Sequence, residues 1–369
     1  MKRLLACLLL CLLLCGCVVV VPEAPAADVP SDSKGLSVHY LDVGQADCML
    51  LQCDGENMLI DGGNVEDSDL VIAYLLEQDV TELEYVVNTH AHEDHVGGLP
   101  AVLAVMETHN VWCPVKQYGS KCFDDFVKYA DQQYLELVCP EPGTQVSLGS
   151  AAVTVLGPVK DNYDTNNSSI VLRVDYGNTG FLFTGDAETQ AEEDILEAGF
   201  DVSATVLKVG HHGSDTSSSY RWLREVGASY AVIPVGTGNS YDHPHDIILS
   251  RLRDADAEVL RTDLQGHIVC YSDGETVTFA TERAAAVTNP TTPVERFIGN
   301  KSSEKFHLES CSGLPKEENR IVFDSYSDAI AAGYTEFWEL AEHFGVTEDF
   351  IRKAVCLYTH GNLEADLYF

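Results

Sequence analysis

Three histidines and two carboxylates fall within six consecutive positions of this chain, in the run His90-Ala91-His92-Glu93-Asp94-His95. The run closely follows the apolar segment Tyr85-Val86-Val87, which predicts a β-strand. A strand that ends in such a cluster delivers imidazoles and a carboxylate to one point at its C-terminal edge. This mixture of nitrogen and oxygen ligands suits zinc, manganese or iron. The alternative is a polar loop with chance histidines, which the density and spacing disfavour.

Polar groups also adjoin other predicted elements further along the chain. Asp186 ends the string Phe183-Thr184-Gly185-Asp186, and the pair His211-His212 follows another apolar run. His243 and His245 precede a predicted helix. Taken singly, Asp186 is equally compatible with a helix N-cap, and His243 and His245 with solvated loop side chains. Because all four clusters lie at or near strand ends, we expect them to meet at a common metal site.

Two strand-rich segments, each followed by helices, predict the architecture of the main domain. Short apolar and β-branched runs bounded by Gly, Asp and Asn indicate strands, and amphipathic runs indicate helices. This order implies an α/β fold, an αββα sandwich in which two packed sheets carry helices on their outer faces. We expect strands at 37–43, 48–53, 58–61, 85–87, 169–174, 181–183, 204–209, 230–235, 259–261, 267–271 and 276–279, and helices at 69–76, 123–134, 188–197, 220–225 and 247–252.

The net negative charge of the chain limits how this protein can bind a polyanion. The chain of 369 residues contains 22 Lys and Arg against 58 Asp and Glu, which gives a formal net charge of −36. An acidic surface repels phosphate backbones, so the composition counts against nucleic-acid binding driven by counterion release. It does not exclude a phosphate ester that metal ions hold directly.

The N-terminus predicts export. Lys2 and Arg3 precede the apolar run 4–14, which is too short for a membrane span. The string Leu14-Cys15-Gly16-Cys17 resembles a bacterial lipobox, in which Cys17 is the lipidated residue. An ordinary signal peptide cut nearby is the alternative, and both readings imply an extracytoplasmic location. Acyl chains on Cys17 would anchor the protein to the outer face of a membrane.

The histidine motif resembles that of a known superfamily. His-x-His-x-Asp-His, with Asp61-Gly62-Gly63 upstream and Asp186 and further histidines downstream, is similar to the metallo-β-lactamase superfamily. A narrower similarity covers about residues 36–282 and points to the hydrolase domain of ComEC-type DNA-uptake (competence) proteins. We expect a relative of that hydrolase domain without the membrane channel. The strings that carry this similarity are Tyr40–Asp47, Asn167–Leu172, Phe183–Asp186 and Leu207–Ser214.

The resemblance implies a pair of divalent metal ions, zinc or manganese. One ion would be held by His90 and His92 and the second by Asp94 and His95, with Asp186 bridging. One member of the pair His211-His212 would complete the second site, and the other would contact substrate. Asp61 is expected to support the metal loop. Many superfamily members carry a further metal histidine before the bridging Asp, which this chain lacks, so the first metal is expected to be ligand-poor.

Such a metal pair implies hydrolysis. Divalent cations make water reactive at neutral pH and neutralise charge on a phosphoryl or carbonyl oxygen. Asp94 could orient that water or accept its proton, and His243 and His245 correspond to a substrate-side histidine of the family. The leading hypothesis is a phosphodiesterase or nuclease, acting on DNA or a cell-wall polymer. Phosphocholine-ester, thioester or lactam hydrolysis, and a non-catalytic surface metal-binding lipoprotein, are the alternatives, and no protein partner is predicted.

Backbone and side-chain donors near these motifs are candidates for binding substrate oxygens. The helix that starts at Gly97-Gly98 is expected to face the metals with its N-terminus and favour anions there. The side chains of Asn167, Ser169 and Ser214 are further candidates.

The C-terminal region resembles a small Ada-like metal-binding module, in Phe297–His307, Cys311 and Asp328–Tyr334. The Cys-x-x-Cys of that module is absent, so His307 and Cys311 are the remaining candidate ligands. Either its metal site is lost, or Cys356 and His360 replace the missing pair.

The expected segments of the whole chain are a lipoprotein signal peptide (1–17), a tether (18–35), a metallo-β-lactamase-fold hydrolase domain (36–283), a linker (284–295), the Ada-like module (296–334) and a helical tail (335–369).

Overall fold

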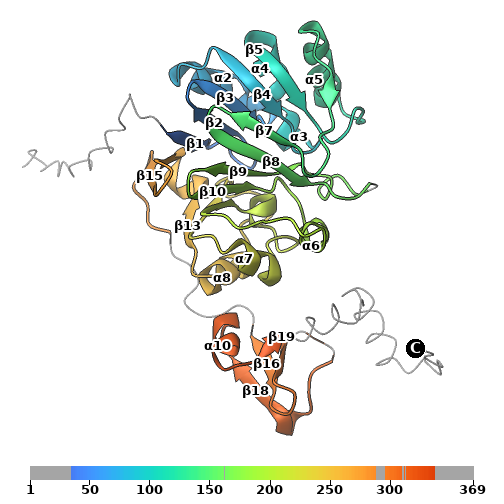
Figure 1. Ribbon diagram of the computed structural model, residues 1–369, viewed down its shortest axis with the longest axis vertical. Helices are drawn as coiled ribbons and strands as arrows, with labels where there is room; N and C mark the ends of the chain where they lie inside the picture. Colours follow the sequence, from blue (N-terminus) through green and yellow to red (C-terminus); the bar gives the residue numbers. More distant parts are fainter. Residues whose placement is uncertain (1–34, 162, 288–295, 310, 312, 337–369) are drawn as a thin grey trace, which may run out of the picture. The chain divides into compact units, whose positions relative to one another are not determined.

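The computed structural model describes residues 35–161, 163–287, 296–309, 311 and 313–336. The lipobox around Cys17, the tether, Cys356 and His360 therefore lie outside the described residues. The main domain consists of two β-sheets packed face to face, with helices on both outer faces (Figure 1). The αββα sandwich expected from the sequence is confirmed. No helix within the described ranges has the length and apolar character needed to cross a membrane.

The first sheet has eight strands in the order β15-β14-β1-β2-β3-β4-β5-β6. Strands β1 to β3 form an antiparallel meander, and β3 to β6 are parallel to one another. Asp54 and Gly55 both have positive φ, 50° and 89°, which suits the two-residue hairpin between β2 and β3. The strands are β1 Leu36–Tyr40, β2 Met49–Cys53, β3 Glu56–Ile60, β4 Glu82–Val87, β5 Glu107–Trp112, β6 Leu137–Val138, β14 Ile268–Ser272 and β15 Val277–Thr281.

The second sheet has seven strands in the order β13-β12-β11-β10-β9-β8-β7. Strands β10 to β13 are parallel, whereas β7 to β10 are antiparallel neighbours. The parallel strands of both sheets deliver the polar clusters at their carboxyl ends. The strands are β7 Gln145–Leu148, β8 Ala151–Gly157, β9 Val171–Tyr176, β10 Thr179–Phe183, β11 Val206–Lys208, β12 Tyr230–Ile233 and β13 Glu258–Arg261.

Three apolar layers hold the sandwich together. The inner layer lies between the sheets and contains the fully buried Met49, Ile60, Leu172 and Phe183. Separate layers pack α2, α4 and α5 on the first sheet and α6, α7 and α8 on the second (Figure 1). The helices are α2 Ser68–Glu77, α3 Glu93–Val96, α4 Leu99–Val105, α5 Lys121–Gln132, α6 Thr189–Glu197, α7 Tyr220–Val226, α8 Asp246–Asp254 and α9 Thr262–Gln265, with the short 3-10 turns η1 Val65–Asp67 and η2 Gly210–Gly213.

Helix α5 illustrates how the sequence encodes these layers. Phe123, Phe126 and Ala130 recur at helical spacing, and all three are buried against the first sheet's outer layer. Ser120 caps the helix, because its Oγ accepts a hydrogen bond from the backbone N–H of Phe123 at 3.3 Å.

One expected strand is shorter than the sequence suggested. The run 37–43 was expected to be extended throughout, but β1 ends at Tyr40. The chain then forms a loop from 41 to 48, closed by a hydrogen bond from Leu41 N to Cys48 O at 3.0 Å. This loop carries Gln45 and Asp47 toward the polar clusters of the second sheet.

The C-terminal region within the described residues forms a separate small sheet in the order β18-β16-β17-β19. Its apolar residues include Phe297, Phe306, Phe323 and Ala329, which are all buried. Its elements are β16 Phe297–Asn300, β17 Lys305–Leu308, η3 Glu317–Asn319, β18 Arg320–Phe323, α10 Tyr326–Ala331 and β19 Thr335–Glu336.

Candidate metal centre

The turn after β4 gathers the predicted histidine cluster. His90 and His95 are fully buried, and their ring centroids are 4.1 Å apart. His90 Nε2 lies 3.0 Å from His92 Nδ1. Asp94 follows within the short helix α3, and its side chain remains 32% exposed. The turn therefore presents two buried imidazoles, a third that is partly exposed, and the Asp94 carboxylate, which solvent still reaches.

Asp61 lies beneath this turn and orients His95. Its carboxylate accepts hydrogen bonds from Thr89 N at 2.7 Å and Thr89 Oγ1 at 2.6 Å, and Oδ2 is 2.8 Å from His95 Nδ1. Glycines allow this close approach, because a Cβ on Gly98 would lie 2.1 Å from Gly62 O. Since Nδ1 of His95 is engaged by Asp61, its Nε2 is the atom left to face the centre.

Asp186 lies just after strand β10 of the second sheet, and its carboxylate faces the histidines that follow β4 of the first sheet. Its Oδ2 lies 3.3 Å from His95 Nε2, 3.8 Å from His90 Nε2 and 3.6 Å from His211 Nε2. Its Oδ1 lies 3.8 Å from His212 Nε2. The carboxylate thus faces both histidine clusters, as a bridging group requires.

The two adjacent histidines in η2 differ in their surroundings. Both have left-handed backbones, with φ of 49° at His211 and 51° at His212. Nδ1 of His212 donates to Pro234 O at 3.0 Å, so its Nε2 points toward Asp94 Oδ2 at 3.4 Å. His211 is more exposed, and its Nδ1 lies 3.4 Å from Glu188 Oε1. Both rings therefore have a second nitrogen near a polar partner, but of the two only His212 belongs to the compact group of potential metal ligands.

Asp94, His95, Asp186 and His212 offer ligand atoms that all lie within 4.8 Å of one another. His95 Nε2, His212 Nε2 and Asp186 Oδ1 are buried and have no hydrogen-bond partner. Buried polar atoms are almost always paired, so three orphans facing one point fit a cation. Among the residues that the structure describes, His90 and His92 belong to no equally compact cluster of three or more potential metal ligands. The second predicted metal position is therefore the more complete one.

The electrostatics of the centre also fit a cation bound by His95 and His212. Burial alone would lower the pKa of His212, but the carboxylates of Asp186 and Asp47 raise it to about 10. Burial likewise opposes the charged form of His95, yet Asp186, Asp61 and Asp94 raise its pKa well above the usual range. Without a cation, these carboxylates hold protons on the two rings, and a divalent ion would displace them.

Comparison with known proteins decides the family. Residues 41–237 match the family model described as the metallo-beta-lactamase superfamily. The chain belongs to this superfamily. It is 29% identical over 259 residues to ComE operon protein 3 of Bacillus subtilis (strain 168), covering 65% of this chain and 33% of that protein. It is 31% identical over 254 residues to competence protein ComA of Neisseria gonorrhoeae, covering 68% of this chain and 33% of that protein.

The metallo-beta-lactamase chain thus spans about a third of the length of these curated relatives. Among solved structures, the metallo-beta-lactamase fold protein YhfI from Bacillus subtilis is 14% identical, with a TM-score of 0.42. That alignment covers 66% of this chain and all of YhfI, 100%. The predicted similarity to the superfamily and to competence proteins is confirmed.

Two buried charged residues at the centre were missed from the sequence. Asp47 and Lys208 are fully buried and form an ion pair between the 41–48 loop and strand β11. Asp47 Oδ1 is 3.3 Å from His212 Nδ1, and Lys208 Nζ donates to Gly185 O at 2.9 Å. The available signal was a lysine inside the apolar strand Val206–Lys208, where an unpaired charge would be costly.

His243 and His245 precede α8 at the rim of the centre, as expected. The His243 ring lies 5.6 Å from that of His211 and 4.8 Å from that of His245. Gln45 Oε1 accepts from Gly236 N at 3.1 Å, which leaves Gln45 Nε2 to donate to His243 Nδ1 at 3.2 Å. His245 Nδ1 instead accepts from Asp215 N at 3.0 Å. His243 is thus the residue of the two that faces the metal-site histidines.

The expected anion site at Gly97-Gly98 is wrong. Gly97 N donates to Glu93 O at 2.8 Å and Gly98 N donates to Gly63 O at 3.2 Å, and both glycines are buried. Their N–H groups are therefore used inside the protein.

The predicted polar side chains near the centre are also hydrogen-bonded within the protein. Asn167 Oδ1 accepts from Glu188 N at 3.2 Å, and Ser169 Oγ accepts from Asp186 N at 3.1 Å. Ser214 Oγ lies 3.0 Å from Thr216 Oγ1. All three are buried, so they support the loops around the metal centre.

In the small C-terminal sheet, Cys311 Sγ lies 3.6 Å from His307 Nδ1. The two predicted ligands are thus adjacent, but among the described residues they form no group of three. The Ada-like assignment stays a prediction.

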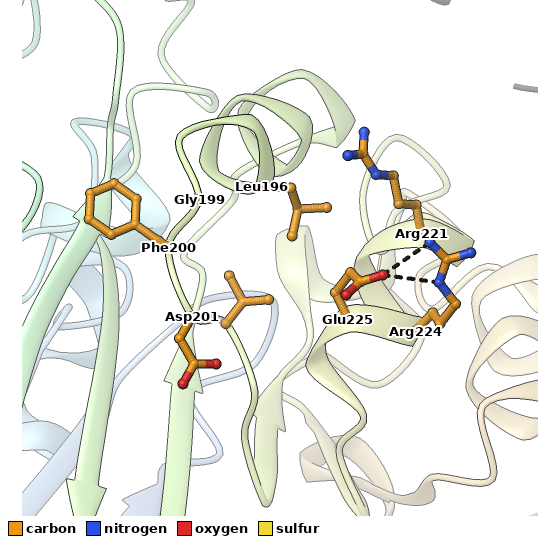
Figure 2. A pocket seen from close by; sticks show the side chains of 8 residues that line it. Leu196, Gly199, Phe200, Asp201, Arg221, Arg224 and Glu225 are labelled. Carbon is orange, nitrogen blue, oxygen red and sulfur yellow. Dashed lines mark hydrogen bonds and ion pairs between the residues drawn. The ribbon is translucent and has the colours of Figure 1, made fainter. Parts of the chain in front are cut away.

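A pocket of about 470 Å³ lies between the end of α6 and helix α7 (Figure 2). Leu196 and Phe200 form its apolar wall, and Arg221 and Arg224 border it. Arg224 is paired with Glu225 at 3.0 Å. None of its lining residues belongs to the metal centre.

Proposed function

We propose that this protein is a metal-dependent phosphodiesterase. The observation that carries the proposal is the convergence of Asp94, His95, Asp186 and His212 within 4.8 Å. Two imidazoles and two carboxylates from three separate segments form the mixed set of ligands that zinc, manganese and iron bind. A binuclear centre would add His90 and His92, with Asp186 between the two cations.

A bound divalent cation would supply Lewis acidity and a water molecule made reactive at neutral pH. The protein's own residues would complete the chemistry. Asp94 is the member of the compact ligand group that solvent reaches. Against the effect of burial, His95 and His212 hold its pKa well below the usual range, so it is suited to orient the water molecule. His211 and His243 lie side by side on the open side of the centre, where they would donate hydrogen bonds to substrate oxygens.

The relatives support nucleic acid as the substrate. One is named a competence protein, and another, recombination protein 2 of Haemophilus influenzae, is 29% identical over 240 residues. The net charge of −36 gives no general attraction for a polyanion. The cations themselves would therefore hold the scissile phosphate.

We also propose that the protein is extracytoplasmic and anchored to a membrane through lipid on Cys17.

The test is a substrate panel with the full-length protein loaded with zinc or with manganese. The panel contains bis(p-nitrophenyl) phosphate, single- and double-stranded DNA, a phosphocholine ester, a thioester and a cephalosporin. We expect hydrolysis of phosphodiesters and its loss in Asp186→Asn, whereas Asp79→Asn at an exposed turn retains activity. A protein that binds metal but leaves every ester intact would instead support a non-catalytic metal-binding role.

A further inference from the structure

A buried ion pair lies directly behind the candidate metal centre. Asp47 comes from the loop between β1 and β2 of the first sheet, and Lys208 ends strand β11 of the second. Both side chains are 0% exposed, and the ammonium contacts Asp47 Oδ2. Replacing a buried pair with apolar residues is often neutral or stabilising, so stability alone is a weak reason for it.

The contacts of Asp47 converge on the proposed ligands. Its Oδ1 lies 3.3 Å from His212 Nδ1 and its Oδ2 lies 3.8 Å from His95 Nδ1. Its backbone N–H donates to Asp94 O at 3.1 Å. One residue therefore touches three members of the compact ligand group, in each case away from the atom that faces the centre.

Lys208 reaches the fourth member. Its Nζ donates to Gly185 O at 2.9 Å and lies 3.9 Å from Asp186 Oδ1. The same Gly185 carbonyl accepts from His211 N at 3.1 Å. Lys208 thus fixes the turn that carries Asp186 and, through Gly185, the turn that carries the two histidines.

We propose that Asp47 and Lys208 act as one positioning pair for the metal centre. Asp47 supplies negative charge behind His212, which keeps the Nδ1 proton on the far side and the Nε2 lone pair toward the cation. Lys208 neutralises Asp47 and holds the Gly185-Asp186 turn. The inference rests on the proposed function only in that both concern the same metal site.

The experiment measures metal binding, independently of hydrolysis, in the full-length protein. Dissociation constants for zinc come from competition with a chromophoric chelator, and cobalt(II) absorption reports ligand geometry. The variants are Asp47→Asn, Lys208→Met and the double variant. Asp42→Asn is the matched control, because Asp42 lies in the same loop and pairs with Arg283 at the surface.

Asp47→Asn and Lys208→Met should each weaken zinc binding by about 10- to 100-fold and change the cobalt spectrum. Because the two residues act as a pair, the double variant should lose less than the product of the two single losses. Asp42→Asn should bind like the wild type. If a single variant fails to fold, the double variant, which buries no unpaired charge, should still fold and bind zinc more weakly.

Wild-type zinc affinity and an unchanged cobalt spectrum in the double variant would overturn the proposal. A double variant whose loss of zinc affinity equals the product of the two single-variant losses would also overturn the proposal, since the residues would then act separately. A wild-type protein that binds no metal would instead remove the proposed function, so the two failures are distinguishable.

Discussion

Asp186 Oδ2 lies 3.3 Å from Nε2 of His95, and this contact joins the ends of strands from two different sheets. His95 belongs to the turn after β4, whereas Asp186 follows β10. A cation bound between them would therefore connect the two layers of the sandwich as well as serve chemistry. The candidate metal site therefore takes its residues from both sheets of the domain.

The two histidines of η2, His211 and His212, give a direct test of this arrangement. His212→Asn should lower zinc affinity by more than about 100-fold, because it removes a ligand whose second nitrogen is anchored by Pro234. Asparagine tolerates the left-handed backbone at this position, so the change leaves the turn intact. Zinc content after dialysis and titration calorimetry measure the effect.

His211→Asn is the matched control, since His211 has nearly the same φ and lies one position away. It should retain zinc affinity and lose hydrolysis. Equal loss of zinc in the two variants would show that the assignment of His212 as the ligand is incorrect.

Much of this centre could be predicted from the sequence, because each polar cluster lies at or near a predicted strand end and the family resemblance implies one shared metal site. The structure brings the His90–His95 turn and Asp186 together although they follow strands of different sheets. The choice between His211 and His212 could not, since it depends on a carbonyl of Pro234 that approaches from another strand. Glycine-rich helix starts often bind anions, but here Gly63 and Glu93 already accept those N–H groups.

The support beneath His95 predicts a second effect. Asp61→Asn should weaken zinc binding by about 10- to 100-fold, because an amide holds the His95 Nδ1 proton less strongly than a carboxylate. Asp79→Asn is the matched control, with φ of 57° against 58° at Asp61 but an exposed side chain. Zinc titration of both proteins checks this, and an Asp61→Asn protein with wild-type affinity would contradict it.

Gln45 predicts a change in the pH–rate profile. Burial, followed by the neighbouring histidines His211, His212 and His245, lowers the pKa of His243 to about 4, so its ring is neutral near pH 7. Gln45→Glu should raise this pKa, because a carboxylate would accept a proton from Nδ1. Hydrolysis of a chromogenic phosphodiester should then vary with pH in a range where the wild type is flat.

Gln45→Leu serves as the control for charge, since it removes the hydrogen bond without adding a carboxylate. It should lower kcat by roughly tenfold without moving the profile toward higher pH. Identical profiles in the Glu variant and the wild type would remove Gln45 as a positioning residue.

Metal removal should destabilise the fold. A ligand at a hundredfold excess over its Kd stabilises the native state by about 2.7 kcal/mol. For a domain of this size, that corresponds to a fall in Tm of roughly 5–10 °C when a chelator is added. Differential scanning calorimetry measures the shift, which should be absent in Asp186→Asn. A chelator that leaves the wild-type Tm unchanged would argue against a bound metal.

Glu192 predicts a pH dependence of stability outside the metal centre. It is buried in α6, where its carboxyl accepts hydrogen bonds from the backbone N–H groups of Ser218 and Ser219. Burial raises the pKa of Glu192 from 4.5 to about 7, against the opposing effect of these N–H groups. Between these two pH values the unfolded chain releases a proton that the folded protein keeps, so stability falls as pH rises through this window. The loss is about 3 kcal/mol and is complete slightly above pH 7.

Glu192→Gln should reduce the fall in stability across this window by about 3 kcal/mol relative to the wild type, because its amide oxygen still accepts a hydrogen bond but does not titrate. Denaturant unfolding of the metal-free proteins at pH 5 and pH 8 measures the difference. Glu197→Gln, at the exposed end of the same helix, should keep the wild-type dependence. The same free-energy change in Glu192→Gln and the wild type would mean that another group titrates, and the carboxyl would then be ionised throughout this range.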